Sequence, residues 1–253
     1  MQRPHPPLSS YYASERERST WVRGIFDRTA ADYDRIERIL GLGTGAWYRR
    51  QALRQAGLQP GMTVVDVGTG TGLLARAAVD IVGDPARVTG VDPSAGMLEH
   101  AKVPAGVRLL EGSAEAIPAP DGSADFLTLG YALRHISDLD QAFAEFYRVL
   151  RPGGRVCLLE ITLPEGKMSR ALLRAWLGGF VPKIATLVAR RRDTPLLMNY
   201  YWDTIAACVP PGAILAALAG AGFVAAERHT DLGVFSVYCA RKPAESGTRP
   251  GIP

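Results

Sequence analysis

Hydrophobic residues recur along the chain with two different periods, and the change of period predicts where each element lies. From residue 14 to 57 they return at three- and four-residue steps, as Trp21, Ile25 and Phe26 do, which predicts helices with a break near Gly41. From residue 63 onward, short β-branched runs alternate with helical stretches. The runs that predict strands are 63–68, 87–92, 107–113, 124–131 and 154–162, and the stretches that predict helices are 72–82, 94–102 and 139–150.

The end of the chain departs from this alternation. A helical stretch at 210–222 is followed by strand-like runs at 223–231 and 233–242, with a tight turn near Leu232, which predicts an antiparallel hairpin. The alternating part predicts right-handed βαβ units. We therefore expect an α/β fold: a Rossmann-like, doubly wound sheet of seven strands with the last strand antiparallel, N-terminal helices, and a helical insertion between strands five and six.

The chain divides by composition into four parts. Residues 1–12 and 243–253 are rich in proline and small polar residues, which predicts a flexible N-terminus and a disordered tail. A helical cap at 13–57 and an α/β domain at 58–242 lie between them. The insertion at 163–200 carries a wide apolar face. That face fits a helix packed on the core or on the N-terminal helices, a lid over an apolar substrate, or a membrane-surface contact.

Charge and cysteine usage narrow the class of protein. The net charge is +4, and the block Arg190–Arg192 favours a solvated loop over a lipid or nucleic-acid contact. Three widely spaced cysteines without paired metal-ligand spacing predict reduced thiols, a cytoplasmic location and no bound metal. No apolar run is long enough to span a bilayer, and the first ten residues contain no apolar run, so we do not expect secretion.

The segment VVDVGTGTGLLAR carries the first sign of chemistry. Gly68, Gly70 and Gly72 lie between a strand and a helix, where the backbone must turn sharply and a ligand can approach closely. Asp66 precedes them and would repel a dinucleotide pyrophosphate, whereas S-adenosylmethionine carries a sulfonium and an ammonium. Asp92 ends the second strand, where an acid accepts ribose hydroxyls of either cofactor. The two acids together favour S-adenosylmethionine over NAD.

Longer segments extend this interpretation to a family. DVGTGTG, VDPSAGML and EFYRVLRPGGRVCLLE, together with IFDRTAADYDRI and NYYWDTI, resemble the class I S-adenosylmethionine-dependent methyltransferases, and specifically the UbiE/MenG quinone C-methyltransferase family. The resemblance runs from about Val22 to Lys242. It implies that residues 58–242 form the domain that binds S-adenosylmethionine.

The resemblance implies a set of cofactor contacts. Asp92 would hold the ribose, Ser113 and Ala114 would flank the adenine, Gly130 would offer backbone near the methionine part, and Met97 is either an adenine contact or a core residue. The family has Asp where this chain has Ser113, and a hydroxyl can still make one hydrogen bond. The remaining implied contacts are Asp66, Gly68, Gly70, Thr71 and Gly72.

Arg134 and His135 follow the fourth strand, at the sheet edge where open α/β folds bind substrates. Methylation of a phenolic ring carbon requires a base for the hydroxyl and a cation or donor for the oxyanion. The resemblance implies a catalytic arginine at Arg134, while the family has Asn where this chain has His135. We expect His135 to act as the base with a pKa near working pH, or to be a structural histidine at a helix start.

The acceptor side departs further from the family. Tyr33 and Asp34 match its YD pair and are candidates for the site, but Glu37 and Gly45 replace an Asn and a His, and Tyr238 replaces a late His. The leading hypothesis is therefore C-methylation of a phenolic or quinol ring related to a quinone head group.

Two other functions stay open at this point. They are O-methylation of a small phenol, and a non-catalytic protein that binds S-adenosylmethionine. The expected partner is a small aromatic substrate, with or without an apolar tail, and no nucleic acid, since no basic stripe with interleaved aromatic residues is visible. A peripheral membrane contact and a homodimer are further open alternatives.

Overall fold

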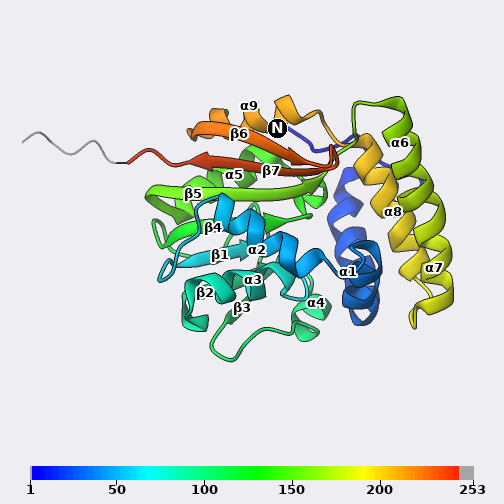
Figure 1. Ribbon diagram of the computed structural model, residues 1–253, viewed down its shortest axis with the longest axis horizontal. Coiled ribbons are helices and arrows are strands. Elements are labelled where there is room, and N and C mark those ends of the chain that lie inside the picture. Colours follow the sequence, from blue (N-terminus) through cyan, green and yellow to red (C-terminus); the bar gives the residue numbers. More distant parts are fainter. Residues whose placement is uncertain (1, 245–253) are drawn as a thin grey trace, which may run out of the picture.

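The computed structural model of the chain describes residues 2–244, and its centre is one seven-stranded sheet (Figure 1). The strand order is β3-β2-β1-β4-β5-β7-β6. Strands β1 to β5 pair in parallel, and β7 is antiparallel to both neighbours. The predicted doubly wound fold with an antiparallel last strand is thus confirmed. The strands are β1 (Val64–Val67), β2 (Val88–Asp92), β3 (Arg108–Glu111), β4 (Ala124–Gly130), β5 (Leu150–Ile161), β6 (Val224–Asp231) and β7 (Phe235–Arg241).

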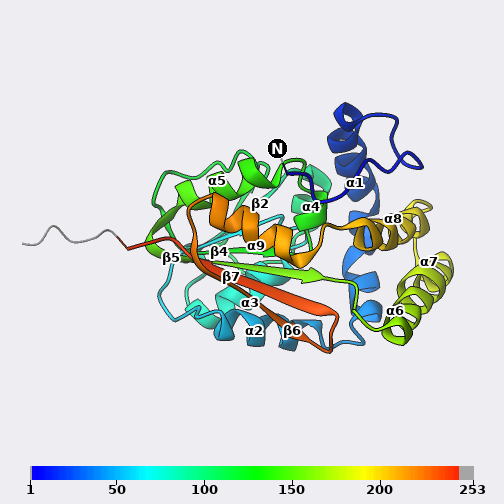
Figure 2. The ribbon, with the colours of Figure 1, turned by 90° about the horizontal axis from the view of Figure 1, so that it is seen from above.

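Helices cover both faces of this sheet (Figure 2). Two of them, α5 (Leu139–Val149) and α9 (Pro211–Gly220), lie on one face, and α2 (Gly45–Gln55) and α3 (Leu73–Val82) lie on the other. Short elements α4 (Ala95–Glu99), η1 (Pro85–Arg87) and η2 (Leu133–His135) complete the α/β part.

The central strands are buried on both faces because their side chains alternate between two apolar layers. Val64 and Phe126 pack toward α2 and α3, whereas their chain neighbours Val65 and Leu127 pack toward α5 and α9. All four are at most 4% exposed. This double burial fixes the register of β1 against β4, and with it the loops that follow both strands.

A third layer lies beyond one end of the sheet, where Figures 1 and 2 show α1 beside the insertion helices. Ile25 and Ile36 of α1 pack against Val181 and Leu197. The insertion therefore packs on the N-terminal helix, one of the arrangements that its apolar face predicts. The elements of this layer are α1 (Glu15–Leu40), α6 (Lys167–Leu173), η3 (Arg174–Phe180), α7 (Val181–Val188) and α8 (Thr194–Ala207).

Residues 2–12 differ from the flexible N-terminus that their composition predicts. The Gln2 carbonyl accepts a hydrogen bond from Leu139 N at 2.8 Å, and the Pro4 carbonyl accepts one from Val209 N at 2.7 Å. His5 and Tyr12 are buried. Long-range contacts of this kind leave no trace in local composition, which is why the segment looked mobile. The predicted tail at 243–253 lies almost entirely outside the described residues.

Within residues 2–244, no single helix is both long and apolar enough to span a bilayer. Helices α8 and α9 reach that length and composition only as a pair bent by 77°.

Candidate active site

The loop between β1 and α3 places three glycines at positive φ. The angles are 63° at Gly68, 55° at Gly70 and 83° at Gly72, a region that favours glycine. A Cβ on Gly68 would lie 2.7 Å from the Cβ of Ala132, and one on Gly72 would lie 2.4 Å from Val103. Gly68 and Gly70 line a cavity above the sheet, hereafter the cofactor cavity, whereas Gly72 packs under Val103.

Asp66 does not reach this cavity, contrary to the direct contact that the family resemblance implies. Its two carboxylate oxygens accept hydrogen bonds from Thr69 Oγ1 and Thr128 Oγ1, both at 2.7 Å. The side chain is fully buried, and this desolvation raises the pKa of Asp66 to about 6 against the lowering effect of those hydroxyls. Asp66 therefore holds the glycine loop from behind.

Asp92 lies at the end of β2 and lines the cofactor cavity. Its Oδ2 accepts from Gly70 N at 2.8 Å, and its Oδ1 accepts from Ser94 N at 2.9 Å. Burial raises the pKa of Asp92 to about 6, although both backbone donors oppose the shift. Each carboxylate oxygen retains a lone pair, so Asp92 can accept further hydrogen bonds from a ligand.

Most of the other cofactor residues expected from the sequence line the same cavity, which brings together the ends of β2, β3 and β4. Those four are Met97, Ser113, Ala114 and Gly130. Helix α1 contributes Tyr33, which the sequence indicated as a candidate, and also Val22, Arg23 and Phe26, which it did not. The helical spacing of Val22 and Phe26 is also that of ordinary core residues, and Arg23 belongs to no motif, so the sequence carried no separate signal for these three.

Thr71 and Asp34 lie outside the cofactor cavity. The Thr71 hydroxyl donates to Asp34 Oδ1 at 2.5 Å, and the other Asp34 oxygen lies 3.6 Å from Lys102 Nζ and 4.0 Å from Arg76. Thr71 is therefore not placed to contact the cofactor, and Asp34 is not placed in the site, as the resemblance had implied. Together they fasten α1 to the glycine loop.

Arg134 does not turn toward an acceptor, contrary to expectation. It is fully buried, forms an ion pair with Glu160, and donates from Nε to Thr204 Oγ1 at 3.1 Å. It does not line the cofactor cavity. Arg18 holds this corner from the other side by donating to the Arg134 carbonyl at 3.0 Å. The short turn η2 directs the side chain of Arg134 into the core, toward β5 and α8.

His135 lines the cofactor cavity among three aromatic rings. The ring centres of Phe26, Tyr200 and Tyr201 lie 5.1, 5.4 and 5.7 Å away, and neither imidazole nitrogen has a hydrogen-bond partner among the described residues. Burial, and then the positive charge of Arg134, lower the pKa of His135 well below 6.5. The expected pKa near working pH is therefore wrong, and the imidazole is neutral.

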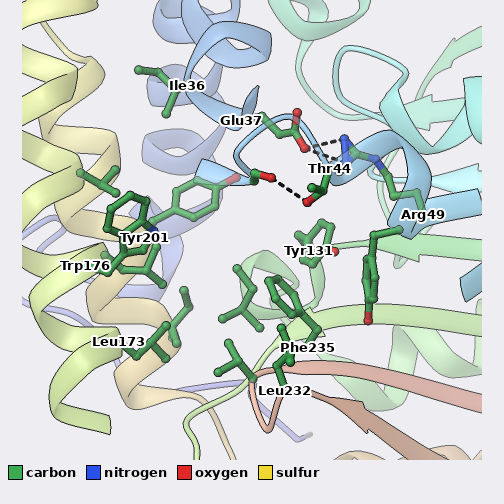
Figure 3. A pocket seen from close by; sticks show the side chains of 18 of the residues that line it. Ile36, Glu37, Thr44, Arg49, Tyr131, Leu173, Trp176, Tyr201, Leu232 and Phe235 are labelled. Atoms are coloured by element: carbon green, nitrogen blue, oxygen red, sulfur yellow. Dashed lines mark hydrogen bonds and ion pairs between the residues drawn. The ribbon is translucent and has the colours of Figure 1, made fainter. Parts of the chain in front are cut away.

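A second and larger cavity of about 620 Å³ adjoins the cofactor cavity, and we name it the acceptor cavity. Tyr33, Tyr131 and Tyr201 line both cavities and so form the wall between them. Tyr131 holds a positive φ of 60°, unusual for an aromatic residue. Figure 3 shows Tyr131 and Phe235 across the cavity from Trp176 and Tyr201.

Comparison with known proteins identifies the family of the chain that forms these two cavities. Residues 13–242 match the ubiE/COQ5 methyltransferase family. The chain belongs to that family. Among curated relatives, the ubiquinone/menaquinone biosynthesis C-methyltransferase UbiE of Shewanella halifaxensis is 32% identical over 180 residues, covering 68% of this chain and 72% of the relative. The corresponding protein of Shewanella piezotolerans is 31% identical over 185 residues, covering 70% and 74%.

Solved structures agree on the fold. A SAM-dependent methyltransferase from Thermotoga maritima superposes with a TM-score of 0.61 at 22% identity, covering 87% of this chain and 99% of its own. One from Aquifex aeolicus has a TM-score of 0.57 at 19% identity, covering 83% and 97%. These structures share the fold that the sequence predicted. Because the chain belongs to the ubiE/COQ5 methyltransferase family, the protein is an S-adenosylmethionine-dependent methyltransferase.

The donor groups of the cofactor cavity fit S-adenosylmethionine. Gly68 and Gly70 offer backbone without side chains, Asp92 offers free lone pairs for hydroxyl donors, and Met97 and Ala114 offer apolar surface for a base. Over residues 2–244, no group of three or more His, Cys, Asp or Glu side chains is arranged to hold a metal ion.

Proposed function

We propose that this methyltransferase transfers the methyl group of S-adenosylmethionine to a ring carbon of a phenol or quinol that carries an apolar tail. The observation that carries the proposal is the shared wall of Tyr33, Tyr131 and Tyr201, across which an acceptor ring would meet the cofactor. Relatives named as ubiquinone/menaquinone biosynthesis C-methyltransferases support the same acceptor class.

The chemistry needs an electron-rich ring, because the bound cofactor supplies an electrophilic methyl group on a sulfonium. A ring carbon becomes nucleophilic as its hydroxyl passes a proton to a base and charge spreads to the ortho and para positions. The proposed base is the neutral imidazole of His135, which lines the cofactor cavity with both nitrogens unpartnered among the described residues. Once the methyl group has left the sulfonium for the ring carbon, the proton on that carbon leaves to water and the ring becomes aromatic again. The hydroxyls of Tyr33 and Tyr201 lie 2.7 Å apart. Burial raises the pKa of both tyrosines, so both remain neutral. One hydroxyl donates to the other, and the remaining O–H can donate to a ring oxygen as it becomes negative.

The apolar lining supports an acceptor with a tail. Leu173, Trp176, Leu177, Leu197 and Met198 line the side formed by the insertion and α8. A tail buried there would gain about 0.8 kcal/mol for each methylene group removed from water. The insertion thus serves as a wall of the tail site in addition to its packing on α1.

The rim of the cavity favours an acceptor taken from a membrane surface. Trp47 and Leu232 line the cavity yet are 64% and 90% exposed. Such side chains are costly to leave in water, and they suit a peripheral contact of a cytoplasmic enzyme with lipid. The cytoplasmic location and the peripheral contact of Trp47 and Leu232 with lipid are both part of the proposal.

The test is transfer of labelled methyl to a series of alkylhydroquinones of increasing tail length, followed by mass spectrometry. We expect product, and a rise in kcat/KM of about fourfold for each added methylene until the cavity is filled. If S-adenosylhomocysteine binds but no acceptor in the series is methylated, the acceptor of this enzyme is not a phenol or quinol with an alkyl tail.

A further inference from the structure

An ion pair faces the acceptor cavity on the side formed by α1 and α2. Arg49 Nη1 and Nη2 donate to Glu37 Oε1 at 2.7 and 2.6 Å, and both side chains line the cavity (Figure 3). The Arg49 side chain is 4% exposed, whereas that of Glu37 is 26% exposed. Both hydrogen bonds from Arg49 go to Oε1, so Arg49 leaves the second oxygen, Glu37 Oε2, free to accept from another donor. A carboxylate oxygen thus remains available inside a largely apolar cavity.

Stability alone does not account for this pair. Removing two charges from water is costly, and an apolar pair of similar volume is often as stable or more stable. The Arg49 Nε is also buried without a partner among the described residues. The Glu37 side chain lines the cavity and is 26% exposed, so a ligand hydroxyl that enters the cavity can replace water at Oε2.

Gly45 provides the space in which the pair forms. A Cβ at this position would lie 2.3 Å from Glu37 Oε1 and 2.7 Å from Arg49 Nη1. Even alanine would therefore displace the charged groups. Glu37 and Gly45 are also two of the positions at which this chain departs from the pattern of its family, and the structure explains why the two departures occur together.

The pair lies close to the wall of tyrosines. Glu37 is one helical turn from Tyr33 on the same face of α1, a spacing that places the Cβ atoms about 5–6 Å apart. Burial raises the pKa of Tyr131, the positive charge of Arg49 lowers it, and the negative charge of Glu37 raises it, so both charges act on this tyrosine. A ring held by Tyr33 is therefore within reach of Glu37.

We propose that Glu37 is a specificity-determining residue, whose Oε2 accepts a hydrogen bond from a hydroxyl group on the acceptor ring. Arg49 is a positioning residue that holds the carboxylate and keeps the site neutral overall, so the site selects a neutral hydroxyl rather than an ionised substituent. The inference rests on the proposed function only for the identity of the acceptor. Binding of a hydroxylated ring can be measured without turnover.

The test compares two probes, para-hexylphenol and its methyl ether, by calorimetry on protein saturated with S-adenosylhomocysteine. Tyrosine hydroxyls can donate to the oxygen of either probe, but only the phenol can donate to Glu37. The wild-type protein should prefer the phenol by about tenfold to hundredfold, the usual range for a hydrogen bond to a charged group. E37Q should reduce this preference, and the double variant E37L/R49L should abolish it.

Two controls separate recognition from folding. E37L/R49L replaces the whole pair by apolar side chains, which avoids leaving a buried charge unpaired, and it should bind S-adenosylhomocysteine as the wild type does. R50Q removes the neighbouring arginine, which pairs with Asp80 at the surface at 3.4 Å, and should keep the full preference for the phenol.

The possible outcomes are distinct. A wild-type protein without preference, or a double variant that retains it, would overturn the role of Glu37 even if methyl transfer occurs. Clear discrimination that disappears in E37L/R49L would uphold that role even if no methyl transfer is ever detected, in which case only the proposed function fails.

Discussion

The guanidinium carbon of Arg134 lies 4.5 Å from the centre of the Tyr201 ring, so the buried cation stacks behind a residue that lines both cavities. A cation over the ring face favours electron density on the ring and its oxygen. The positive charge of Arg134 opposes the burial that raises the pKa of Tyr201. Arg134 can therefore strengthen Tyr201 as a donor without touching the acceptor.

The first prediction concerns the Tyr201 hydroxyl. Y201F should lower kcat for methyl transfer about a hundredfold with little change in KM, because it removes a donor needed mainly as the ring oxygen becomes negative. Y200F is the matched control, since Tyr200 is adjacent but lines neither cavity. Steady-state kinetics with a quinol acceptor checks both variants, and equal losses of kcat would refute the specific role of Tyr201.

The second prediction concerns the stability of the Arg134 corner. R134Q leaves the buried Glu160 unpaired and should lower the free energy of unfolding by about 3–5 kcal/mol. R151Q breaks the half-exposed pair with Asp125 and should cost less than about 1 kcal/mol. Urea denaturation measures both variants. An R134Q protein as stable as R151Q would mean that the ion pair between Arg134 and Glu160 does not stabilise the fold.

The third prediction is a pH dependence that originates at His135. Below about pH 6.5 the unfolded chain binds a proton at this histidine that the folded protein does not, so folded stability falls as the pH falls. Between pH 7 and pH 5.5 the wild type should lose about 1 kcal/mol more unfolding free energy than H135N. Identical pH profiles of unfolding would show that His135 is not held neutral.

The fourth prediction concerns Asp92. If it binds hydroxyl groups of the cofactor, D92N should weaken S-adenosylhomocysteine about tenfold to hundredfold. Because the pKa of Asp92 is about 6, wild-type affinity should be greatest above pH 6 and decline as the carboxylate is protonated below it. Calorimetry from pH 5 to pH 8 should show a shallower decline in D92N, where Asp66 still titrates. Unchanged affinity would exclude the contact.

The sequence predicted those features that local pattern determines. Alternating periods identified the sheet, and the glycines after β1 located the loop that Gly68 and Gly70 provide to the cofactor cavity. Asp92 lies where strand-end chemistry places an acid. These features depend on residues that lie close together in the chain, so a short stretch of sequence is enough to predict them.

Long-range partners decided the rest. The direction of Arg134 depends on Glu160 and Thr204, which lie 26 and 70 residues away. The neutral state of His135 depends on burial by Phe26 and Tyr200, which come from two other helices. No local motif encodes such neighbours. The adjacent Arg134 and His135 therefore suggest paired catalytic groups in the sequence, although Arg134 lies in the core and His135 lines the cofactor cavity.

The position of the transferred methyl group distinguishes methylation of a ring carbon from methylation of a hydroxyl oxygen. The enzyme would be supplied with S-adenosylmethionine carrying a carbon-13 methyl group and with a hexylhydroquinone acceptor, and the product would be examined by NMR. Transfer to carbon would give a labelled methyl carbon bonded to a ring carbon, with both hydroxyl groups intact, and this is the result we expect. A labelled methoxy carbon would contradict it and identify the protein as an O-methyltransferase.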